Sequence, residues 1–267
     1  MSEDRIVIRR VETQAEYDEC VRIEDQTWGV GFNERVPATI LKVAQYLGGV
    51  TAAAFDGDGG PMLGFVFGMT GVQDGKLVHW SDLLAVRPEA RNRGLGRRLK
   101  LYQRSQVVQL GVTRMLWTYD PLVARNAQLN LNALGAQVTE YVPEMYGADT
   151  GSALHDEIGT DRFVLAWDLT AAPGTRPAPA GGGPGLAPPA SLVVNLVTDQ
   201  VPEDAPELFV AIPDDIQHLI TTAPGTARAW RESTRSAFLH WLGRGYRVSG
   251  FRRAGGGGYY RLSRSED

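Results

Sequence analysis

Two glycines and several basic residues stand together in the stretch Arg91-Asn92-Arg93-Gly94-Leu95-Gly96-Arg97. The stretch follows an apolar run that ends at Val86 and precedes a helical pattern. The first N–H groups of a helix have no partner within the helix and carry a partial positive charge, which suits a pyrophosphate. Glycine lets a ligand approach the backbone closely. The pattern therefore favours a phosphate-binding turn, and the simpler alternative is a tight strand–helix turn with a solvated basic face.

Two other phosphate-binding patterns do not fit the sequence. A Rossmann dinucleotide site needs three glycines after the first strand and an acidic residue at the end of the next strand. The present sequence has two glycines, which follow four expected strands. A P-loop needs Gly-Lys followed by Ser or Thr, and the sequence has no such triplet.

Asp82 is the residue best suited by type and place to act as a general base. It lies in the apolar run 77–86, where Asp is disfavoured and an unpaired buried carboxylate is costly. The competing interpretation is that Asp82 accepts hydrogen bonds from backbone N–H groups at a β-bulge. His79 is a second candidate base, although a single histidine in a strand is more often structural.

The elements that must position these residues alternate between strands and helices. Apolar runs separated by Gly and Asp turns predict strands at 6–11, 50–55, 62–69, 77–86, 112–118, 138–142 and 163–169. Helical spacing predicts helices around 17–23, from just after 37 to 46, and over 95–110 and 126–134. The strands between 50 and 86 are expected to form an antiparallel meander. The expected fold class is α/β (α+β), with a mixed central sheet flanked by helices.

A segment rich in Pro, Gly and Ala, 171–190, predicts a linker between a first domain, 1–170, and a small α/β C-terminal extension, 191–267. The extension is expected to contain strands at 192–197, 208–212, 246–251 and 259–262 and a helix at 227–242. Its helix–strand–strand order resembles that of 126–169, which suggests a degenerate half-repeat. The extension has no second Arg-x-x-Gly-x-Gly, so we expect no second nucleotide site there.

The stretch around Arg91, Gly94 and Gly96, preceded by Val86-Arg87-Pro88-Glu89, resembles the signature of the GNAT superfamily of acyl-CoA-dependent N-acyltransferases. The order of elements is similar to that family over about 5–170. The sequences at 117–122, 125–127 and 134–136 resemble a subgroup of predicted GNAT enzymes with a C-terminal extension.

The resemblance implies acyl-CoA as cosubstrate. Its pyrophosphate is expected on the backbone of Arg91, Asn92, Arg93, Gly94, Leu95, Gly96 and Arg97, and its pantetheine arm along Leu84, Ala85 and Val86. The family's helix-start asparagine falls at Ala124, so Asn126 would have to serve.

The resemblance also implies direct transfer of the acyl group to an amine, so Cys20 need not be catalytic. Asp82 stands where carboxylate bases occur in the family. The usual acid, a tyrosine, is replaced by Leu131, and we expect Tyr141, Tyr146 or Tyr119 to act instead.

Acceptor recognition is expected from Trp28 in the first helical region and from Arg162, which could bind a substrate carboxylate. The alternative for Arg162 is a surface ion pair with Asp161 at a strand start. Trp28 could equally belong to the core.

The expected function is transfer of an acetyl or another acyl group, such as succinyl, to the amine of a small molecule, with an amino acid as one candidate. The alternatives are a protein N-acetyltransferase and a CoA-binding protein without turnover. The chain of 267 residues has a net charge of −4, which argues against a nucleic-acid partner. One cysteine and no long apolar run favour a cytoplasmic location without a membrane segment. No metal is expected, and a homodimer is a candidate assembly.

Overall fold

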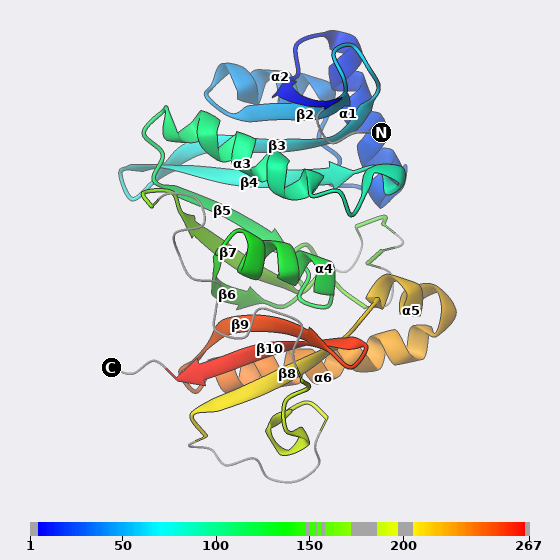
Figure 1. Ribbon diagram of the computed structural model, residues 1–267, viewed down its shortest axis with the longest axis vertical. Coiled ribbons are helices and arrows are strands. Elements are labelled where there is room, and N and C mark those ends of the chain that lie inside the picture. Colours follow the sequence, from blue (N-terminus) through cyan, green and yellow to red (C-terminus); the bar gives the residue numbers. More distant parts are fainter. Residues whose placement is uncertain are drawn as a thin grey trace. The chain divides into compact units, whose positions relative to one another are not determined.

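A computed structural model describes residues 5–147, 150–152, 154–155, 158–171, 186–196 and 205–264 (Figure 1). The described residues fall into two compact units. The first contains the described parts of 1–117, 150–153 and 167–173, and the second contains those of 118–149, 154–166 and 174–267. The boundaries expected from the sequence, 1–170 and 191–267 around a linker at 171–190, stay a prediction.

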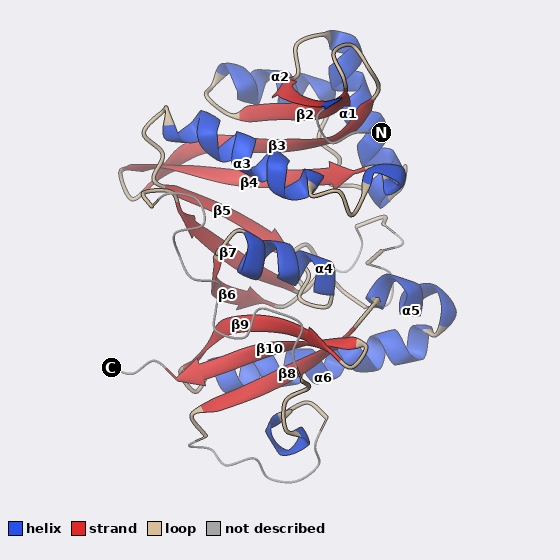
Figure 2. Ribbon diagram, viewed as in Figure 1, coloured by secondary structure: helices blue, strands red, loops and turns tan. Residues whose placement is uncertain are grey.

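Strands and helices alternate along the chain, as the sequence indicated (Figure 2). The elements are β1 (Ile6–Arg10), α1 (Gln14–Trp28), α2 (Ala38–Tyr46), β2 (Val50–Asp56), β3 (Met62–Gln73), β4 (Lys76–Val86), the 3-10 turn η2 (Pro88–Ala90), α3 (Leu95–Val108), β5 (Arg114–Tyr119), α4 (Ala124–Ala127), the π-helical η3 (Gln128–Ala133), β6 (Gln137–Val142), β7 (Arg162–Asp168), the 3-10 turn η4 (Ala190–Leu192), β8 (Glu207–Pro213), α5 (Ile216–Thr222), α6 (Pro224–Leu242), β9 (Tyr246–Ala254) and β10 (Gly257–Arg264).

The strands form a seven-stranded sheet in the order β1-β2-β3-β4-β5-β7-β6 and a three-stranded sheet in the order β8-β10-β9. In the first unit, β1 to β4 are antiparallel neighbours, and β5 runs parallel to β4. The expected meander and the expected mixed sheet flanked by helices are therefore confirmed.

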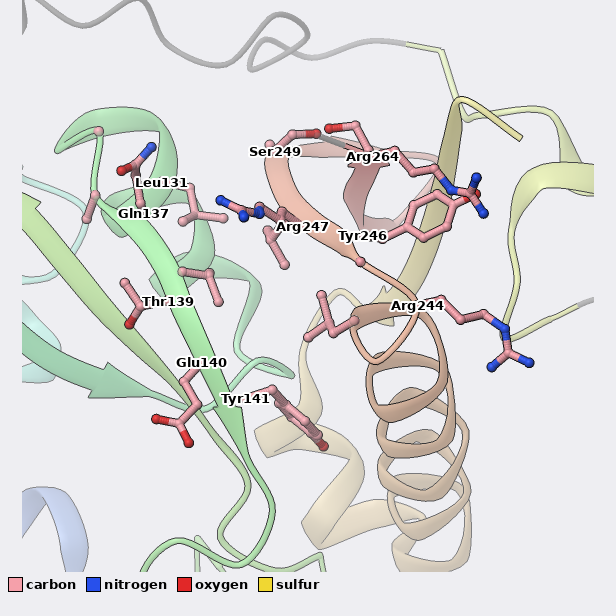
Figure 3. A pocket seen from close by; sticks show the side chains of 18 residues that line it. Leu131, Gln137, Thr139, Glu140, Tyr141, Arg244, Tyr246, Arg247, Ser249 and Arg264 are labelled. Carbon is pink, nitrogen blue, oxygen red and sulfur yellow. The ribbon is translucent and has the colours of Figure 1, made fainter. Parts of the chain in front are cut away.

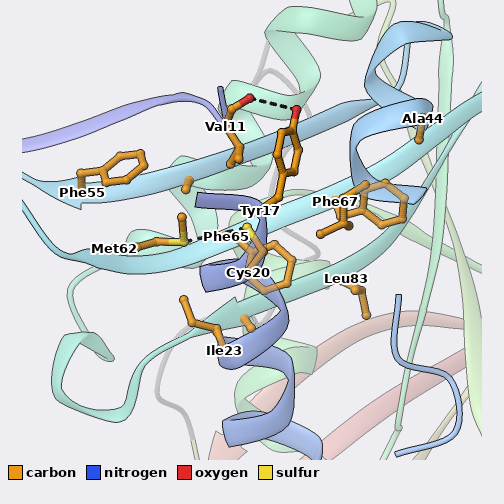
Figure 4. Close-up of a cluster of buried hydrophobic side chains, with 13 residues drawn as sticks. Val11, Tyr17, Cys20, Ile23, Ala44, Phe55, Met62, Phe65, Phe67 and Leu83 are labelled. Carbon is orange, nitrogen blue, oxygen red and sulfur yellow. Dashed lines mark hydrogen bonds between the residues drawn. The ribbon is translucent and has the colours of Figure 1, made fainter. Parts of the chain in front are cut away.

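Helices cover both faces of the sheet in the first unit. Tyr17 and Cys20 of α1 pack against Phe67 of β3 within one cluster of buried side chains (Figure 4). Burial raises the pKa of the Cys20 thiol, as expected for a core residue. The next residue of β3, Gly68, points the other way, because a Cβ there would lie 2.7 Å from the side-chain nitrogen of Gln103 in α3. Successive strand residues point to opposite faces, so α3 covers the face opposite to α1.

Local sequence signals set the ends of these elements. The Thr13 side chain accepts the Glu16 N–H, and the Glu16 carboxylate accepts the Thr13 N–H, so the two form a capping box at the start of α1. Asp74 and Gly75 have φ of 52° and 72°, which the tight turn between β3 and β4 requires. The Asp215 side chain caps α5 by accepting the His218 N–H at 3.1 Å.

In the second unit, β10 lies between β8 and β9 and is antiparallel to both. Aromatic rings fill the core beside it, since Phe163, Phe238 and Tyr260 meet edge to face with centroids 4.8 to 5.6 Å apart. The order β8-β10-β9 repeats the order β5-β7-β6, because in both sets the last strand of the chain enters between the earlier two. This order supports the half-repeat, which stays a prediction.

Two expected elements differ from the structure. The strand expected at 192–197 is absent from its described part, where η4 is followed by one bridge between Val193 and Phe209 and by a turn; Val197 lies outside the described residues. The helix expected at 126–134 is a single α-turn that continues as the π-helix η3. At both places the sequence identified the apolar residues correctly, but the pattern of backbone hydrogen bonds that they adopt was predicted wrongly.

Candidate functional site

The turn between β4 and α3 adopts an unusual backbone conformation. Asn92 and Gly94 have φ of 60° and 69°, a left-handed region in which glycine carries no steric penalty. Gly94 is the N-cap of α3, and no side chain caps this helix end. The Arg98 N–H donates to the Gly94 carbonyl at 3.1 Å. The earlier N–H groups of this turn, including that of Gly96, find no partner within the helix.

Two arginines hold this turn against the rest of the first unit. The Arg87 Nε donates to the Met62 carbonyl at 2.9 Å, and its guanidinium pairs with Glu19. The Arg98 guanidinium donates to the Ile6 carbonyl at 3.1 Å. The guanidinium groups of Arg87 and Arg98 therefore contribute to the structure of the first unit by anchoring the turn.

The other arginines of the turn differ in their exposure and in their contacts. The Arg91 Nε donates to the Val86 carbonyl at 3.1 Å, while Arg91 and Arg97 are exposed. Arg93 carries a buried guanidinium nitrogen without a hydrogen-bond partner. Such a group is costly unless an acceptor satisfies it. The turn therefore suits a ligand that brings anionic oxygens.

β4 pairs with β5 only over part of its length, and we call the place in the first unit where this pairing ends the fork. The paired residues run from Val78 with Arg114 to Trp80 with Leu116. Beyond these pairs β4 continues to Val86 and stays paired with β3 on its other edge. On the side of the fork, its backbone therefore has no partner strand among the described residues. This free edge includes all three residues expected along a pantetheine arm, Leu84, Ala85 and Val86.

A β-bulge lies at the closed end of the fork. The register between β3 and β4 shifts so that Ser81 and Asp82 stand opposite the single residue Gly68. Asp82 is thus at a bulge, but its exposed carboxylate accepts the Trp80 indole N–H at 3.1 Å. Loss of hydration raises the pKa of Asp82, while the Trp80 hydrogen bond and the Lys100 charge oppose the rise. A raised pKa makes this carboxylate a stronger base near neutral pH.

Glu24 of α1 is a second perturbed carboxyl group, and it was not among the expected site residues. It is 1% exposed, its Oε2 accepts the Val36 N–H at 2.8 Å, and its Oε1 has no partner. Burial raises the pKa of Glu24 to about 7; the Val36 N–H and Arg35 oppose this rise, and the charges of Asp25 and Asp82 add to it.

A buried polar cluster of Lys100, Ser81 and Gln103 packs behind the bulge. Lys100 is 2% exposed, and its Nζ donates to the Ser81 Oγ at 2.6 Å. The same Nζ lies 4.0 Å from the centre of the Trp117 ring. The Ser81 hydroxyl donates to the Gln103 Oε1 at 2.7 Å. Burial lowers the pKa of Lys100 to about 7, and only the charge of Asp82 opposes this shift.

His79 borders this cluster and is a poor base. Its Nδ1 lies 3.0 Å from the Thr70 Oγ1, and its Nε2 has no partner. Burial, followed by the charge of Lys100, lowers the pKa of His79 to about 3. The imidazole is therefore neutral and weakly basic at neutral pH.

In the second unit, Arg162 is buried, and none of the described carboxylates pairs with its guanidinium. It is 7% exposed, its Nη1 donates to the Asp161 carbonyl at 3.0 Å, and its Nη2 lies 2.9 Å from the His155 Nε2. The Asp161 carboxylate instead accepts the Arg235 Nε–H at 2.8 Å. The alternative of a surface Asp161–Arg162 ion pair is therefore wrong.

The candidate tyrosine acids all have partners within the second unit. Tyr141 donates to the Asp161 carboxylate, and burial followed by this hydrogen bond raises the pKa of Tyr141. The Tyr146 hydroxyl lies 2.9 Å from the Thr118 Oγ1, and the Tyr146 ring lies 5.3 Å from the Arg162 guanidinium. The Tyr119 hydroxyl donates to that of Tyr260 at 3.2 Å. Their catalytic roles stay predictions.

The remaining expected site residues occupy ordinary structural positions. Trp28, the last residue of α1, stacks on Phe32 with centroids 5.7 Å apart, and its carbonyl accepts the Ser152 hydroxyl at 2.6 Å. Asn126 lies in α4 of the second unit. Leu131, which occupies the place of the family's tyrosine, is buried.

A cavity of about 1320 Å³ lies within the second unit between β6 and β9 (Figure 3). Each of these strands is the last in its sheet, so both present an unpaired backbone edge. Tyr141 and Glu140 line one wall, and Arg247 extends from the other (Figure 3).

Within the described ranges, no group of three or more His, Cys, Asp or Glu side chains could hold a metal ion. No described helix is both long enough and apolar enough to cross a membrane.

No protein-family model matches the chain, and no curated protein matches it. Solved structures do. One is yncA from Salmonella typhimurium with its cofactor acetyl-CoA, at 19% identity and a TM-score of 0.48, with 64% of this chain and 99% of that chain covered. Another is the ribosomal-protein-S18-alanine N-acetyltransferase from Escherichia coli, at 18% identity and a TM-score of 0.47, with 64% of this chain and 98% of that chain covered. A third, from the GNAT family, comes from Desulfovibrio desulfuricans, at 19% identity and a TM-score of 0.47, with 62% of this chain and 99% of that chain covered.

Proposed function

We propose that the chain is an acyl-CoA-dependent N-acyltransferase that moves an acetyl or another acyl group to an amine. The main support is that one unit combines the fork with the uncapped start of α3. An extended ligand arm that carries amide groups can hydrogen-bond to the free edge of β4 at 84–86, as an added strand would. A pyrophosphate suits the first N–H groups of α3 and the basic turn at 91–97.

The residues around the turn fit such a cosubstrate. No described atom lies within 4 Å of the point where a Cβ on Gly94 would stand, so this point at the helix start is open. The unpartnered guanidinium nitrogen of Arg93 would gain an acceptor from a phosphate oxygen. Arg91 and Arg97 add positive charge at the surface of the same turn.

Asp82 is the proposed base of the reaction. Acyl-CoA supplies a thioester carbonyl, and the acceptor amine must lose a proton in order to form an amide. Asp82 is exposed and has a raised pKa, so it can take that proton. No covalent enzyme intermediate is required, which agrees with the buried position of Cys20.

A small amino acid is the proposed acceptor, and Arg162 is proposed to bind its carboxylate. The support is that, among the described residues, this buried guanidinium has the His155 imidazole and a carbonyl as its hydrogen-bond partners. No anion among the described residues contacts this cation, and a buried cation in that state gains most from a carboxylate ligand. Trp28, Asn126, Tyr141 and Tyr146 stay candidate site residues. The cytoplasmic location and homodimeric assembly also stay predictions.

The test of cosubstrate binding is Gly94→Glu, measured by calorimetry with acetyl-CoA. The substitution places bulk and negative charge at the helix start, so we expect at least a hundredfold loss of affinity, about 2.7 kcal/mol. The matched control is Gly111→Glu beyond the other end of α3. Gly111 also has positive φ and open space around its missing Cβ, so the backbone cost is comparable. Equal affinity of both folded variants and the wild type would contradict the proposal.

Turnover is then measured with acetyl-CoA and succinyl-CoA against amino acids, simple amines and peptides. Transfer to peptides alone would favour a protein N-acetyltransferase. Binding of acyl-CoA without transfer to any amine would favour a CoA-binding protein that lacks turnover.

A further inference from the structure

The Lys100 side chain contacts both strands at the closed end of the fork. Trp80 and Leu116 are the last residues that join β4 to β5. Ser81 and Trp117 are therefore the first residues beyond the junction, one on each strand. The Lys100 Nζ contacts both, at 2.6 Å from the Ser81 Oγ and 4.0 Å from the Trp117 ring centre. A ligand that lies along the free edge of β4 ends at this pair.

The hydrogen-bond directions make Ser81 a proton relay. The Lys100 ammonium can only donate, so the Ser81 oxygen accepts from it. The Ser81 hydroxyl proton points to the Gln103 Oε1, whose side-chain nitrogen has no partner of its own. The hydroxyl can rotate toward a stronger acceptor in the fork while it keeps the bond from Lys100.

The charged surroundings of Lys100 leave its ammonium poorly compensated. The titratable groups that act on it are both on β4: Asp82, whose charge favours the ammonium, and His79, which is neutral. No carboxylate forms an ion pair with Lys100 among the described residues. The ammonium therefore yields a proton far more readily than an exposed lysine does.

We propose that Ser81 protonates the thiolate that leaves acyl-CoA and that Lys100 positions and recharges this hydroxyl. The proposal rests on the acyltransferase function above. In the family a tyrosine usually donates this proton, and Leu131 stands in its place here, so Ser81 takes over the role. Lys100 acts through Ser81, so Ser81 is the residue that touches the reacting sulfur.

The step balances without any further reactant. The acceptor amine forms its bond to the thioester carbonyl carbon and gives a proton to Asp82, and the C–S bond breaks with its electron pair on sulfur. The sulfur takes the Ser81 hydroxyl proton, and Ser81 takes one from Lys100. The products are the amide and the CoA thiol. Lys100 is left neutral and Asp82 protonated, and exchange with solvent restores both.

The role of Lys100 has a distinct pH signature. Lys100 must be protonated to supply the relay, so its contribution to kcat is present below pH 7 and is lost as the pH rises through about 7. In Lys100→Arg the cation persists at all accessible pH values but cannot give up its proton, so kcat should be low and this decline should vanish. In Lys100→Met and Ser81→Ala, kcat should fall roughly a hundredfold, the lower range for general acid catalysis.

The matched control is Lys76→Met, at an exposed lysine on β4, the strand that carries Ser81. The calorimetric Kd for acetyl-CoA should be unchanged in all variants, which separates failure of this inference from failure of the proposed function. Weak or absent acetyl-CoA binding by the wild type would overturn both. Normal transfer by Lys100→Met across the pH range would overturn the relay alone.

A second measurement needs no acceptor. Free CoA is bound to the protein, and its thiolate is titrated by ultraviolet absorbance. A cation that stays charged stabilises a nearby thiolate, so Lys100→Arg should form the thiolate at least tenfold more readily than Lys100→Met, about one pH unit lower. Identical titrations would place the sulfur away from Ser81 and overturn the proposal.

Discussion

Glu24 should make the protein less stable as the pH rises, which is unusual for a carboxylic acid in a folded protein. The pKa of Glu24 is raised from the usual 4.5 to about 7, chiefly by burial. The folded state therefore keeps a proton that the unfolded chain releases. Stability falls as the pH rises from about 4.5 to about 7 and is constant above that range.

The size of the effect follows from the two pKa values. Each pH unit of difference corresponds to about 1.4 kcal/mol, so a rise from 4.5 to about 7 amounts to about 3 kcal/mol. Glu24→Gln removes the ionisation and keeps an oxygen that can accept the Val36 N–H. The variant should be more stable than the wild type at pH 8 by about 3 kcal/mol and nearly equal to it at pH 4.5.

Urea unfolding at pH 4.5, 6 and 8 measures this difference. The control is Glu89→Gln, at an exposed carboxylate of η2, which should change stability little at any of these pH values. Because m reports the surface exposed on unfolding, equal m values keep the free energies comparable. A gap between Glu24→Gln and the wild type that does not widen from pH 4.5 to pH 8 would refute the reasoning.

Two further outcomes concern the reaction. Asp82→Asn should lower kcat roughly 100- to 10,000-fold with acetyl-CoA affinity retained. A near-normal rate between pH 6 and 9 would mean that Asp82 is not the base and has only a structural role at the β-bulge. Arg162→Met should weaken use of an amino acid by about a hundredfold, or 2.7 kcal/mol, without changing use of the decarboxylated amine. Equal use of both acceptors by the wild type would exclude a carboxylate site.

The sequence predicted the first unit well because its signals are local. Alternating apolar runs, the Asp74-Gly75 turn and the glycines around 94 each act within a few residues. The order of elements and the strand–turn–helix at 86–95 therefore agree with the structure.

The buried polar groups were harder to predict, since their roles depend on contacts between distant elements. In the sequence, Lys100 resembles the other basic residues on the surface of α3. In the structure it is buried against Ser81 of β4 and Trp117 of β5. One signal could have identified Glu24: it follows Tyr17 and Cys20 at helical spacing, on the apolar face of α1. A bulge at Asp82 was one of two interpretations of the sequence, and the choice depended on the register between β3 and β4, which a sequence does not give.

The position of β10 has a consequence for how the chain is made. β10 follows β8 and β9 in the sequence but lies between them, as β7 does between β5 and β6. On the ribosome, a nascent chain that ends just after β9 contains β8 and β9 but not β10, the strand that pairs with both. Each presents an open edge until the next hairpin emerges, so the sheet can close only after synthesis has passed its central strand. A pause in translation just before β10 would therefore expose two aggregation-prone strand edges, those of β8 and β9, at the same time.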